Sequence, residues 1–470
     1  MTVLDWALLA GYFVLLIVIG VQTIRRVRSA DDFAVAGNRI IWPVFFGSLA
    51  ASFLGGGASL GVAGKTFTDG YVYMFAFFGY AVSFLLIGLF VAPRLKRYLG
   101  AHTVGDVMEE HYGRGARLIT GVLSILLCAG ILGAQALAIG TVVNATLQLP
   151  TVPSVIVGMG VVVLYSSFGG AWAVIQTDML QFVFLGVFIP VTLVLALGEV
   201  GGPAGLLAAL PEAHLTFGGG YGVLMFIGLF VSFLLGETLV PPYAQRTFST
   251  PDGRHARIGF AMSGGFAFLF YFIAASIGLV ALVLFPNVSP DQAIPTVVMN
   301  LLPAGLIGLV VAALLAVVMS TASSYLNSIA VVFVKDIYQP FVNPQVSAQK
   351  KLWLERGLSL GVGVVATVFA LSVPSIVDAL LYSYTFWAPT IVIPLLAAVL
   401  LGSRAKAAAL SAIAAGAVVT AGWILFLQES TGLDGLVVGA VANVVVFAVV
   451  AFATRSTPTM PARRPVAEEA

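Results

Sequence analysis

Long apolar stretches separated by short polar connections follow one another along the whole chain. Each stretch has about the 20 residues that a helix needs to cross a bilayer. The pattern predicts an all-α polytopic membrane protein with thirteen spans, at residues 4–23, 42–68, 71–93, 117–147, 152–170, 172–197, 220–243, 256–286, 303–334, 355–373, 377–401, 405–427 and 434–454.

Basic residues indicate the orientation, because Lys and Arg gather in cytoplasmic connections. With the N-terminus outside and the C-terminus inside, 21 of the 22 basic residues, Arg246 among them, lie in cytoplasmic connections or in the C-terminal tail. A count that is wrong by one span would destroy this pattern. Lys65 is the exception, at the outer end of the second span, where it could pair with Asp69 or attract an anionic solute.

Composition supports the same class of protein and excludes others. With 60% hydrophobic and 9% charged residues, no water-soluble fold of this length could bury the apolar surface, so we expect a multi-pass protein of the cell membrane, surrounded by lipid. A single cysteine, Cys128, excludes a disulfide framework, and the four histidines in polar connections disfavour a metal centre. The small net charge of +2 gives no reason to expect nucleic acid as a partner.

Two of the spans are interrupted at corresponding places. The second span contains three consecutive glycines, Gly55 to Gly57, each of which weakens a helix by about 1 kcal/mol relative to alanine. The seventh contains Pro241 and Pro242, which remove backbone donors and clash with the preceding turn. Such residues are common in membrane helices, but matching breaks in two five-span units predict an inverted-repeat transporter with a site near the bilayer midplane.

The span 303–334 carries a polar face inside an apolar helix. Residues three, four and seven positions apart lie on one side of a helix, and this spacing aligns Ser320, Thr321, Ser323, Ser324, Asn327 and Ser328. Small polar side chains of this kind can serve close packing between helices. The alternative hypothesis is that their oxygens bind cations. Two acidic residues also lie clearly inside spans, Asp178 and Glu237. A carboxylate at such depth usually belongs to an ion or solute pathway.

Three stretches resemble the sodium:solute symporter family: SSFGGAWAVIQTDMLQ at 166–181, AQRTFST at 244–250 and AVVMSTASSYLNSIAVVFVKDIY at 316–338. The motif SFLGGG and the connection DQAIPTVVMNLLP are most similar to the choline-transporter-like bacterial branch. The resemblance implies a LeuT-type fold, in which ten core spans form two inverted five-span repeats, with one preceding and two following helices. The implied parts are an N-terminal helix and cytoplasmic loop (1–41), a first repeat (42–197), an extracellular connection (198–219), a second repeat (220–402), two C-terminal helices (403–454) and a disordered cytoplasmic tail (455–470).

The resemblance also implies Na⁺ as the coupling ion. The family's common sodium site corresponds here to the backbone carbonyls of Ala51, Leu54 and Val317 with the hydroxyls of Ser320 and Thr321. A second site of some members corresponds to Asp178, Ser320, Ser323 and Ser324. Neutral oxygens at a helix break suit a hard cation, and a bound cation would offset the cost of burying Asp178. Two Na⁺ ions per transport cycle are therefore expected.

The solute should bind between the two helix breaks. The candidate lining residues are Phe53, Gly56, Gly57, Ala58, Gln135, Glu237, Val240, Tyr243, Tyr384 and Trp387. Gln135 could equally make an interhelical hydrogen bond, and Tyr384 and Trp387 could be packing residues. Phe53 and Val240 stand where the choline branch carries tryptophans, so the sequence leaves amino acid, monocarboxylate, polyol and cationic amine open.

A symporter of a small organic solute, for which a monomer suffices, is thus the predicted function. A solute-sensing transceptor or a channel-like protein of the same fold are the alternatives, and the segment 455–470 is short for a signalling domain. An enzyme is not expected, because no cluster of nucleophile, base and orienting group lies in an aqueous stretch.

Overall fold

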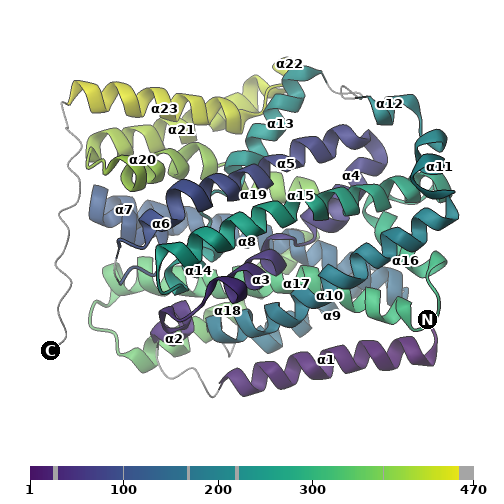
Figure 1. The fold of residues 1–470 in the computed structure, drawn as a ribbon. Coiled ribbons are helices and arrows are strands. Elements are labelled where there is room, and N and C mark those ends of the chain that lie inside the picture. Colours follow the sequence, from purple (N-terminus) through teal and green to yellow (C-terminus); the bar gives the residue numbers. More distant parts are fainter. Residues whose placement is uncertain (25–29, 99, 167–169, 217–221, 374, 455–470) are drawn as a thin grey trace.

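The computed structural model describes residues 1–24, 30–98, 100–166, 170–216, 222–373 and 375–454, and the regular elements in these ranges are all helical (Figure 1). The predicted tail at 455–470 and the basic residues Arg25, Arg26 and Arg28 lie outside the described residues. The prediction of an all-α membrane protein is confirmed.

Ten helices among the described residues are long and apolar enough to cross a membrane. They are α1 (Val3–Ile24), α5 with η3 and α6 (Tyr71–Leu95), α8 (Arg114–Leu147), α10 (Gly170–Glu199), α15 (Gly253–Leu284), α17 with η5 (Leu306–Val342), α18 (Ala348–Ala370), α19 with η6 and α20 (Ile376–Leu401), α21 (Lys406–Phe426) and α23 (Gly435–Ala453).

Two further spans are bent pairs of helices. In the first pair, α3 (Trp42–Phe53) is followed by η2 (Gly57–Gly61) and α4 (Val62–Asp69), with a bend of 62°. In the second, α13 (Val223–Gly236) is followed by α14 (Pro241–Ser249), with a bend of 43°. With the shorter helix α9 (Thr151–Ser166), these elements lie at the positions of the thirteen predicted spans. The number that crosses the bilayer and the orientation stay predictions.

Short helices connect the spans. They are α2 (Ala30–Val35), η1 (Ala36–Asn38), α7 (Val104–Tyr112), α11 (Gly202–Ala209), α12 (Glu212–Leu215), η4 (Pro290–Gln292), α16 (Ala293–Leu301) and α22 (Gln428–Thr431). Both α11 and α12 belong to the predicted extracellular connection, and α7 lies at the opposite end of the molecule (Figure 1).

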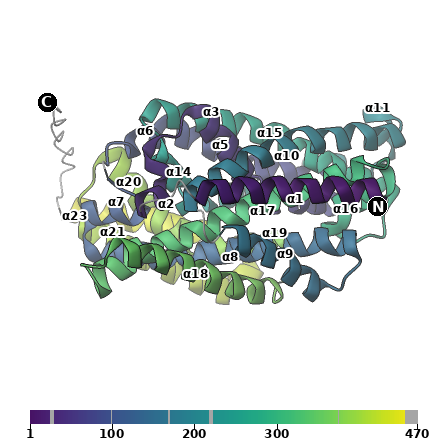
Figure 2. The ribbon, with the colours of Figure 1, turned by 90° about the horizontal axis from the view of Figure 1, so that it is seen from below.

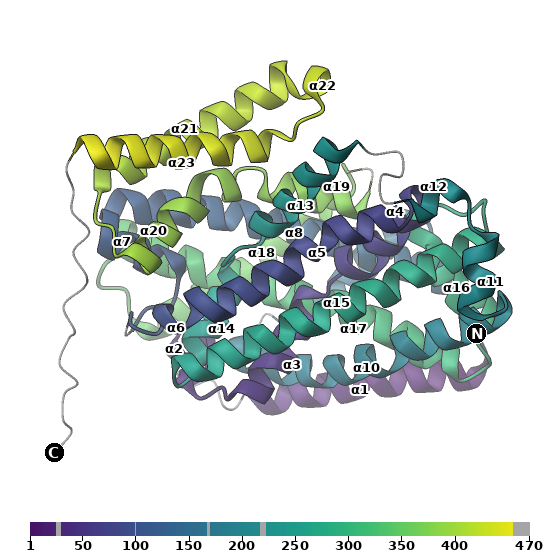
Figure 3. The same ribbon diagram turned by 45° about the horizontal axis from the view of Figure 1, so that its top comes forward.

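Helix α17 forms the centre of the bundle. Every residue from 310 to 332 is buried, and the helix packs against α8, α10 and α3. Helix α1 runs along α10 and α17 on one flank (Figure 2), whereas the α21–α23 pair covers the opposite flank (Figure 3). The serine-rich face of α17 therefore faces other helices, so its hydroxyl groups must find partners inside the protein.

Candidate sodium and solute sites

The first helix break brings backbone close to two polar side chains. Helix α3 ends at Phe53, and Leu54 already has non-helical backbone angles (φ −78°, ψ 13°). A Cβ atom on Gly55 would lie 2.5 Å from Oγ1 of Thr321 and 2.6 Å from Oε1 of Gln135. Glycine is required here because any side chain would collide with the groups that approach the break.

The second break has a different local cause. Helix α13 ends at Gly236, and Leu239 has a positive φ of 52°, which is uncommon for a residue other than glycine. Pro241 and Pro242 then begin α14, where proline's missing N–H is no loss. The indole N–H of Trp387 donates to the carbonyl of Thr238 at 3.1 Å, so it satisfies part of the freed backbone.

Four of the five residues predicted for the first sodium site meet between α3 and α17. The Ser320 hydroxyl donates to the carbonyls of Ala51 (2.7 Å) and Val317 (2.8 Å). The Thr321 hydroxyl lies 3.3 Å from the Val317 carbonyl and donates at 2.7 Å to the carbonyl of Ser52. Leu54 caps α3 by donating its N–H to the carbonyl of Ala50, and among the described residues no hydrogen bond joins it to α17. The cluster is uncharged and composed of oxygen, which suits Na⁺.

The second predicted site contains an ion pair that sequence analysis missed. Oδ2 of Asp178, on α10, accepts from Arg246 Nη2 at 2.8 Å and from the hydroxyl of Ser48 at 2.6 Å. Arg246 Nη2 also lies 2.7 Å from the hydroxyl of Ser324. The assignment of Arg246 to a cytoplasmic connection was wrong: the residue lies inside α14, and its side chain is 7% exposed. Counting basic residues overlooked that a buried acid can hold one of them in the core.

The remaining predicted ligands of the second site lie next to this pair. Ser52 links Asp178 (3.1 Å) to Ser324 (2.9 Å between hydroxyl oxygens). The hydroxyls of Ser323 and Ser324 donate to the carbonyl of Ser320, at 3.0 and 2.8 Å. Oδ1 of Asp178 is buried and has no hydrogen-bond partner in the described structure. That atom is an unused anionic ligand, and a monovalent cation would fit its chemistry.

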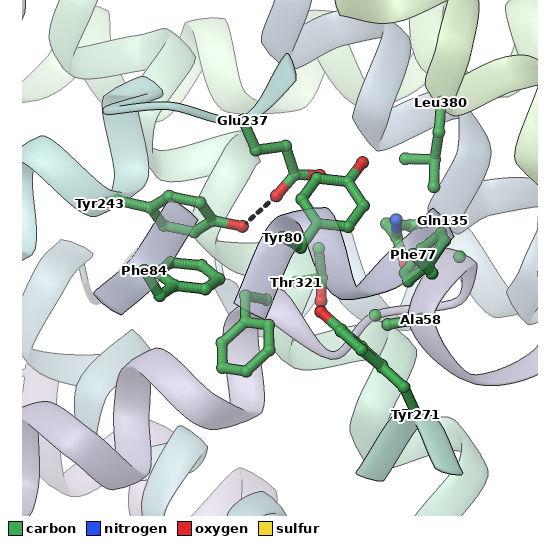
Figure 4. A pocket seen from close by; sticks show the side chains of 13 residues that line it. Ala58, Phe77, Tyr80, Phe84, Gln135, Glu237, Tyr243, Tyr271, Thr321 and Leu380 are labelled. Atoms are coloured by element: carbon green, nitrogen blue, oxygen red, sulfur yellow. Dashed lines mark hydrogen bonds between the residues drawn. The ribbon is translucent and has the colours of Figure 1, made fainter. Parts of the chain in front are cut away.

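A small cavity lies between the two breaks (Figure 4). The space that the centre of a water molecule can occupy is about 10 Å³, so the cavity has room for about one water. Its walls include six of the ten predicted solute residues: Phe53, Gly57, Ala58, Gln135, Glu237 and Tyr243. Sequence analysis missed Phe77, Tyr80, Phe84, Tyr271 and Leu380, and it assigned Gly55 only to the helix break and Thr321 only to the first sodium site. The aromatic residues among these had no signal of their own, because each lies in an apolar helix where rings usually serve packing.

The other four predicted residues lie behind the residues that line this cavity. The N–H of Gly56 donates to Oε1 of Gln135 at 2.7 Å. Tyr384 shares a hydrogen bond of 2.7 Å with the hydroxyl of Tyr80, and Trp387 bonds to the second break. Val240 is fully buried at the start of α14. These four support the walls and do not belong to the lining.

A second, separate cavity lies beside the ion pair. It is lined by residues of α2, α10, α14 and α17: Ala34, Ala171, Val174, Ile175, Pro242, Gln245, Arg246, Ser249, Ser324, Asn327 and Ser328. The part of the polar face of α17 formed by Ser324, Asn327 and Ser328 therefore borders this second cavity, whereas Ser320 and Thr321 contact the broken helix α3.

Comparison with known proteins decides the family. A family model described as the sodium:solute symporter family matches residues 33–416. The chain belongs to the sodium:solute symporter family. This family consists of transporters, so the predictions of a membrane transporter and against an enzyme are confirmed.

Relatives within the sodium:solute symporter family carry different solutes. The chain is 26% identical to the high-affinity choline transporter 1 of Drosophila melanogaster over 78% of its length, 28% to the human sodium/iodide cotransporter over 73%, and 27% to the sodium/sialic acid symporter of Aliivibrio fischeri over 78%. It covers 62%, 57% and 75% of those proteins, respectively. Two of these three names, those of the iodide and sialic acid transporters, state sodium coupling, and the three proteins carry different solutes.

Solved structures confirm the LeuT-type fold. An outward-open, substrate-bound Na⁺-coupled sialic acid symporter superposes with a TM-score of 0.83 at 19% identity, covering 96% of this chain and 98% of that one. A transporter of the nucleobase-cation-symport-1 family superposes with a TM-score of 0.61 at 15% identity, covering 92% and 96%. At these identities the likeness concerns the fold.

Proposed function

We propose that this protein is a sodium-coupled symporter that takes up a small organic solute by alternating access, with two Na⁺ ions per cycle. The observation that carries the proposal is the contact of Ser320 and Thr321 with carbonyls of the broken helix α3. Thr321 also lines the solute cavity. Thr321 thus belongs to the ion cluster and also borders the solute cavity, which is the geometry that coupling requires.

At the first site, Na⁺ would replace the hydrogen bonds that now join the two helices. Both hydroxyls at present donate to carbonyls, so each can rotate its proton away and present its oxygen to a cation. An ion held by oxygens of α3 and α17 favours the conformation in which these helices are close. Loss of the ion to the cytoplasm would release the contact and let the helices separate.

At the second site, Na⁺ would bind the carboxylate of Asp178 beside Arg246. The free Oδ1 of Asp178 supports this proposal because it adds a charged ligand without breaking the existing bond to Oδ2. Ser324 and Ser320 would complete the oxygen set, with Ser323 one position away on the same helix. The cavity beside the pair, lined by Ser324, Asn327 and Ser328, offers a polar route by which the ion could leave.

Two ions would give strong accumulation of solute. Each Na⁺ that moves inward down about 100 mV supplies roughly 2.3 kcal/mol, which is more than one decade of solute concentration. Both breaks, both ion clusters and the cavity belong to one chain. We therefore propose that a monomer suffices for transport.

Thermal unfolding of the purified protein tests this function without knowledge of the solute. A ligand that binds only the folded state raises the unfolding temperature. We expect the unfolding temperature to rise with NaCl added at constant ionic strength and not with KCl. A panel of small solutes should then reveal compounds that stabilise the protein further in Na⁺ only. Equal stability in both salts, together with solute binding that ignores Na⁺, would contradict the proposal.

A further inference from the structure

Glu237 brings a carboxylate into the solute cavity (Figure 4). Its Oε2 accepts a hydrogen bond from the hydroxyl of Tyr243. No ion pair joins Glu237 to a lysine, arginine or histidine within the described ranges. A carboxylate held this deep in a membrane protein is costly without a counter-charge. The cavity therefore offers a negative group whose partner must come from outside the chain or be a proton.

The hydrogen-bond donors around the cavity are largely committed to other groups. Tyr243 donates to Glu237, Thr321 donates to the carbonyl of Ser52, and the N–H of Gly56 donates to Gln135. Tyr80 and Tyr384 share one hydrogen bond between their hydroxyls. An anionic solute needs several donors or a cation. Among the described lining residues, only the amide N–H2 of Gln135 and the hydroxyl of Tyr271 are side-chain donors that make no hydrogen bond to another described residue, and no lysine, arginine or histidine lines the cavity.

A buried arginine near the cavity is also committed to other groups. Arg246 bonds through its guanidinium to Asp178, Ser48, Ser52 and Ser324, and it does not belong to the cavity lining. It cannot clamp a solute carboxylate without leaving Asp178 buried and uncompensated.

Aromatic rings form most of the remaining wall. Phe53 and Phe84 lie with ring centroids 4.5 Å apart, and Phe77 and Tyr271 with centroids 5.0 Å apart at an interplanar angle of 90°. These rings come from three separate helices, α3, α5 and α15, and Figure 4 shows Phe84, Phe77 and Tyr271 around the same space as Glu237. The faces of aromatic rings attract cations, most strongly where water is excluded.

We infer that the transported solute is an organic ammonium cation, bound with its charge between the carboxylate of Glu237 and the aromatic wall. In this conformation the cavity has room for about one water, so the surrounding helices must move apart to admit the solute. This inference rests on the proposed symport function. Sequence alone left four solute classes open, and the structure favours one because the described residues that line the cavity include one carboxylate, several rings and no lysine, arginine or histidine. The uncommitted Oε1 of Glu237 can accept from a protonated amine, whereas a quaternary ammonium would rely on the rings.

Calorimetric titration of the purified, full-length protein in NaCl tests the inference. Ethanolamine serves as a protonated amine, choline as a quaternary ammonium, lactate as a monocarboxylate, glycine as a zwitterion and myo-inositol as a polyol. We expect binding of ethanolamine, choline or both, and no binding of lactate or myo-inositol. Ethanolamine binding alone would assign the charge mainly to Glu237, whereas stronger choline binding would assign it to the rings.

Two variants locate the bound charge. Glu237→Gln keeps the size and polarity of the side chain and removes its charge, so ammonium affinity should fall at least about tenfold. Phe84→Leu should lower it by about tenfold or more through loss of a ring face. Glu212→Gln, at an exposed position on α12, is the matched control and should bind as the parent does. Retained stabilisation by Na⁺ shows that each variant is folded.

The outcomes separate this inference from the proposed function. If lactate, glycine or myo-inositol binds and neither ammonium compound does, or if no ammonium compound binds to protein that Na⁺ stabilises, the solute class is wrong and sodium coupling stands. Unchanged ammonium affinity in Glu237→Gln would also overturn the inference. If ammonium compounds bind equally well in NaCl and KCl, the solute class stands and the coupling is contradicted.

Discussion

Arg246 and Asp178 form an ion pair in the membrane-spanning core, with 2.8 Å between Nη2 and Oδ2. The Asp178 side chain is completely buried. The pair joins α14, the second half of a bent helix, to α10, and the hydroxyls of Ser52 and Ser324 lie within hydrogen-bond distance of it. It therefore connects a helix break with the serine-rich face of α17.

Removal of Arg246 tests whether a bound Na⁺ can compensate the buried charge of Asp178. Arg246→Ala leaves Asp178 buried without a counter-charge, which costs about 3–5 kcal/mol of stability. Sodium at the second site would replace part of the lost charge. The rise in unfolding temperature from KCl to NaCl should therefore be larger for this variant than for the parent protein. Thermal unfolding in the two salts measures both effects.

The double variant Asp178→Asn, Arg246→Gln is the control for this experiment. It removes both charges and should recover much of the stability, while its extra stabilisation by Na⁺ disappears. An Arg246→Ala protein that is as stable as its parent in KCl would show that Asp178 does not need the arginine.

The glycines of the first break differ in what lies opposite them. A Cβ on Gly56 would lie 2.3 Å from the Cβ of Ala138, which cannot rotate away, whereas one on Gly57 would meet Cδ1 of Leu380 at 1.9 Å, at the end of a flexible side chain. We expect Gly56→Ala to be the more destabilising, by about 1–3 kcal/mol. Thermal unfolding compares the two variants.

Two controls complete the glycine experiment. Leu380→Ala should rescue Gly57→Ala, because it removes the atom that the new methyl group meets, and it should not rescue Gly56→Ala. Gly186→Ala, where no atom lies within 4 Å of the added methyl group, should leave stability unchanged or raise it. Equal losses at Gly56, Gly57 and Gly186 would show that the break imposes no close approach.

His111 predicts a pH dependence of stability. Its Nδ1 donates to the carbonyl of Ser403 at 2.7 Å, and its Nε2 lies 2.9 Å from the hydroxyl of Tyr98. Burial lowers the pKa of His111, against a smaller raising effect from the Ser403 carbonyl. The folded protein thus keeps this ring neutral in a pH range where the unfolded chain binds a proton, so its contribution to stability is complete above about pH 6.5 and is lost as the pH falls below that value.

The unfolding temperature measured between pH 5 and 8 checks this dependence. The parent protein should lose stability toward the acid end, and His111→Gln, which cannot take up a proton, should show a shallower fall. An identical fall in both proteins would assign the pH dependence to other groups.

The sequence predicted the fold because its signals are local. Apolar length, the glycines at Gly55 to Gly57 and the prolines at Pro241 and Pro242 each determine structure within their own helix, and the bends occur at those positions. Helix spacing alone places the hydroxyls of Ser320 and Thr321 on one face of α17, whereas their contact with α3 was expected only from the family resemblance.

What the sequence could not predict depends on contacts between distant segments. Arg246 carries no local sign that it pairs with Asp178, 68 positions earlier, and the rule for basic residues placed it in a loop. Phe77 and Phe84 have the same hydrophobic surroundings as any packed ring, so only their three-dimensional position relative to Glu237 makes them part of a cavity.

The central claim is that Ser320 contributes to both sodium sites, and direct measurement of ²²Na⁺ binding to the purified protein tests it without any solute. The parent protein should bind about two ions per chain, and Thr321→Ala and the double variant Asp178→Asn, Arg246→Gln about one each. Ser320→Ala should bind almost none, whereas Ser263→Ala, a buried serine on α15, should behave as the parent does. A Ser320→Ala protein that still binds as many sodium ions as the parent would contradict the account.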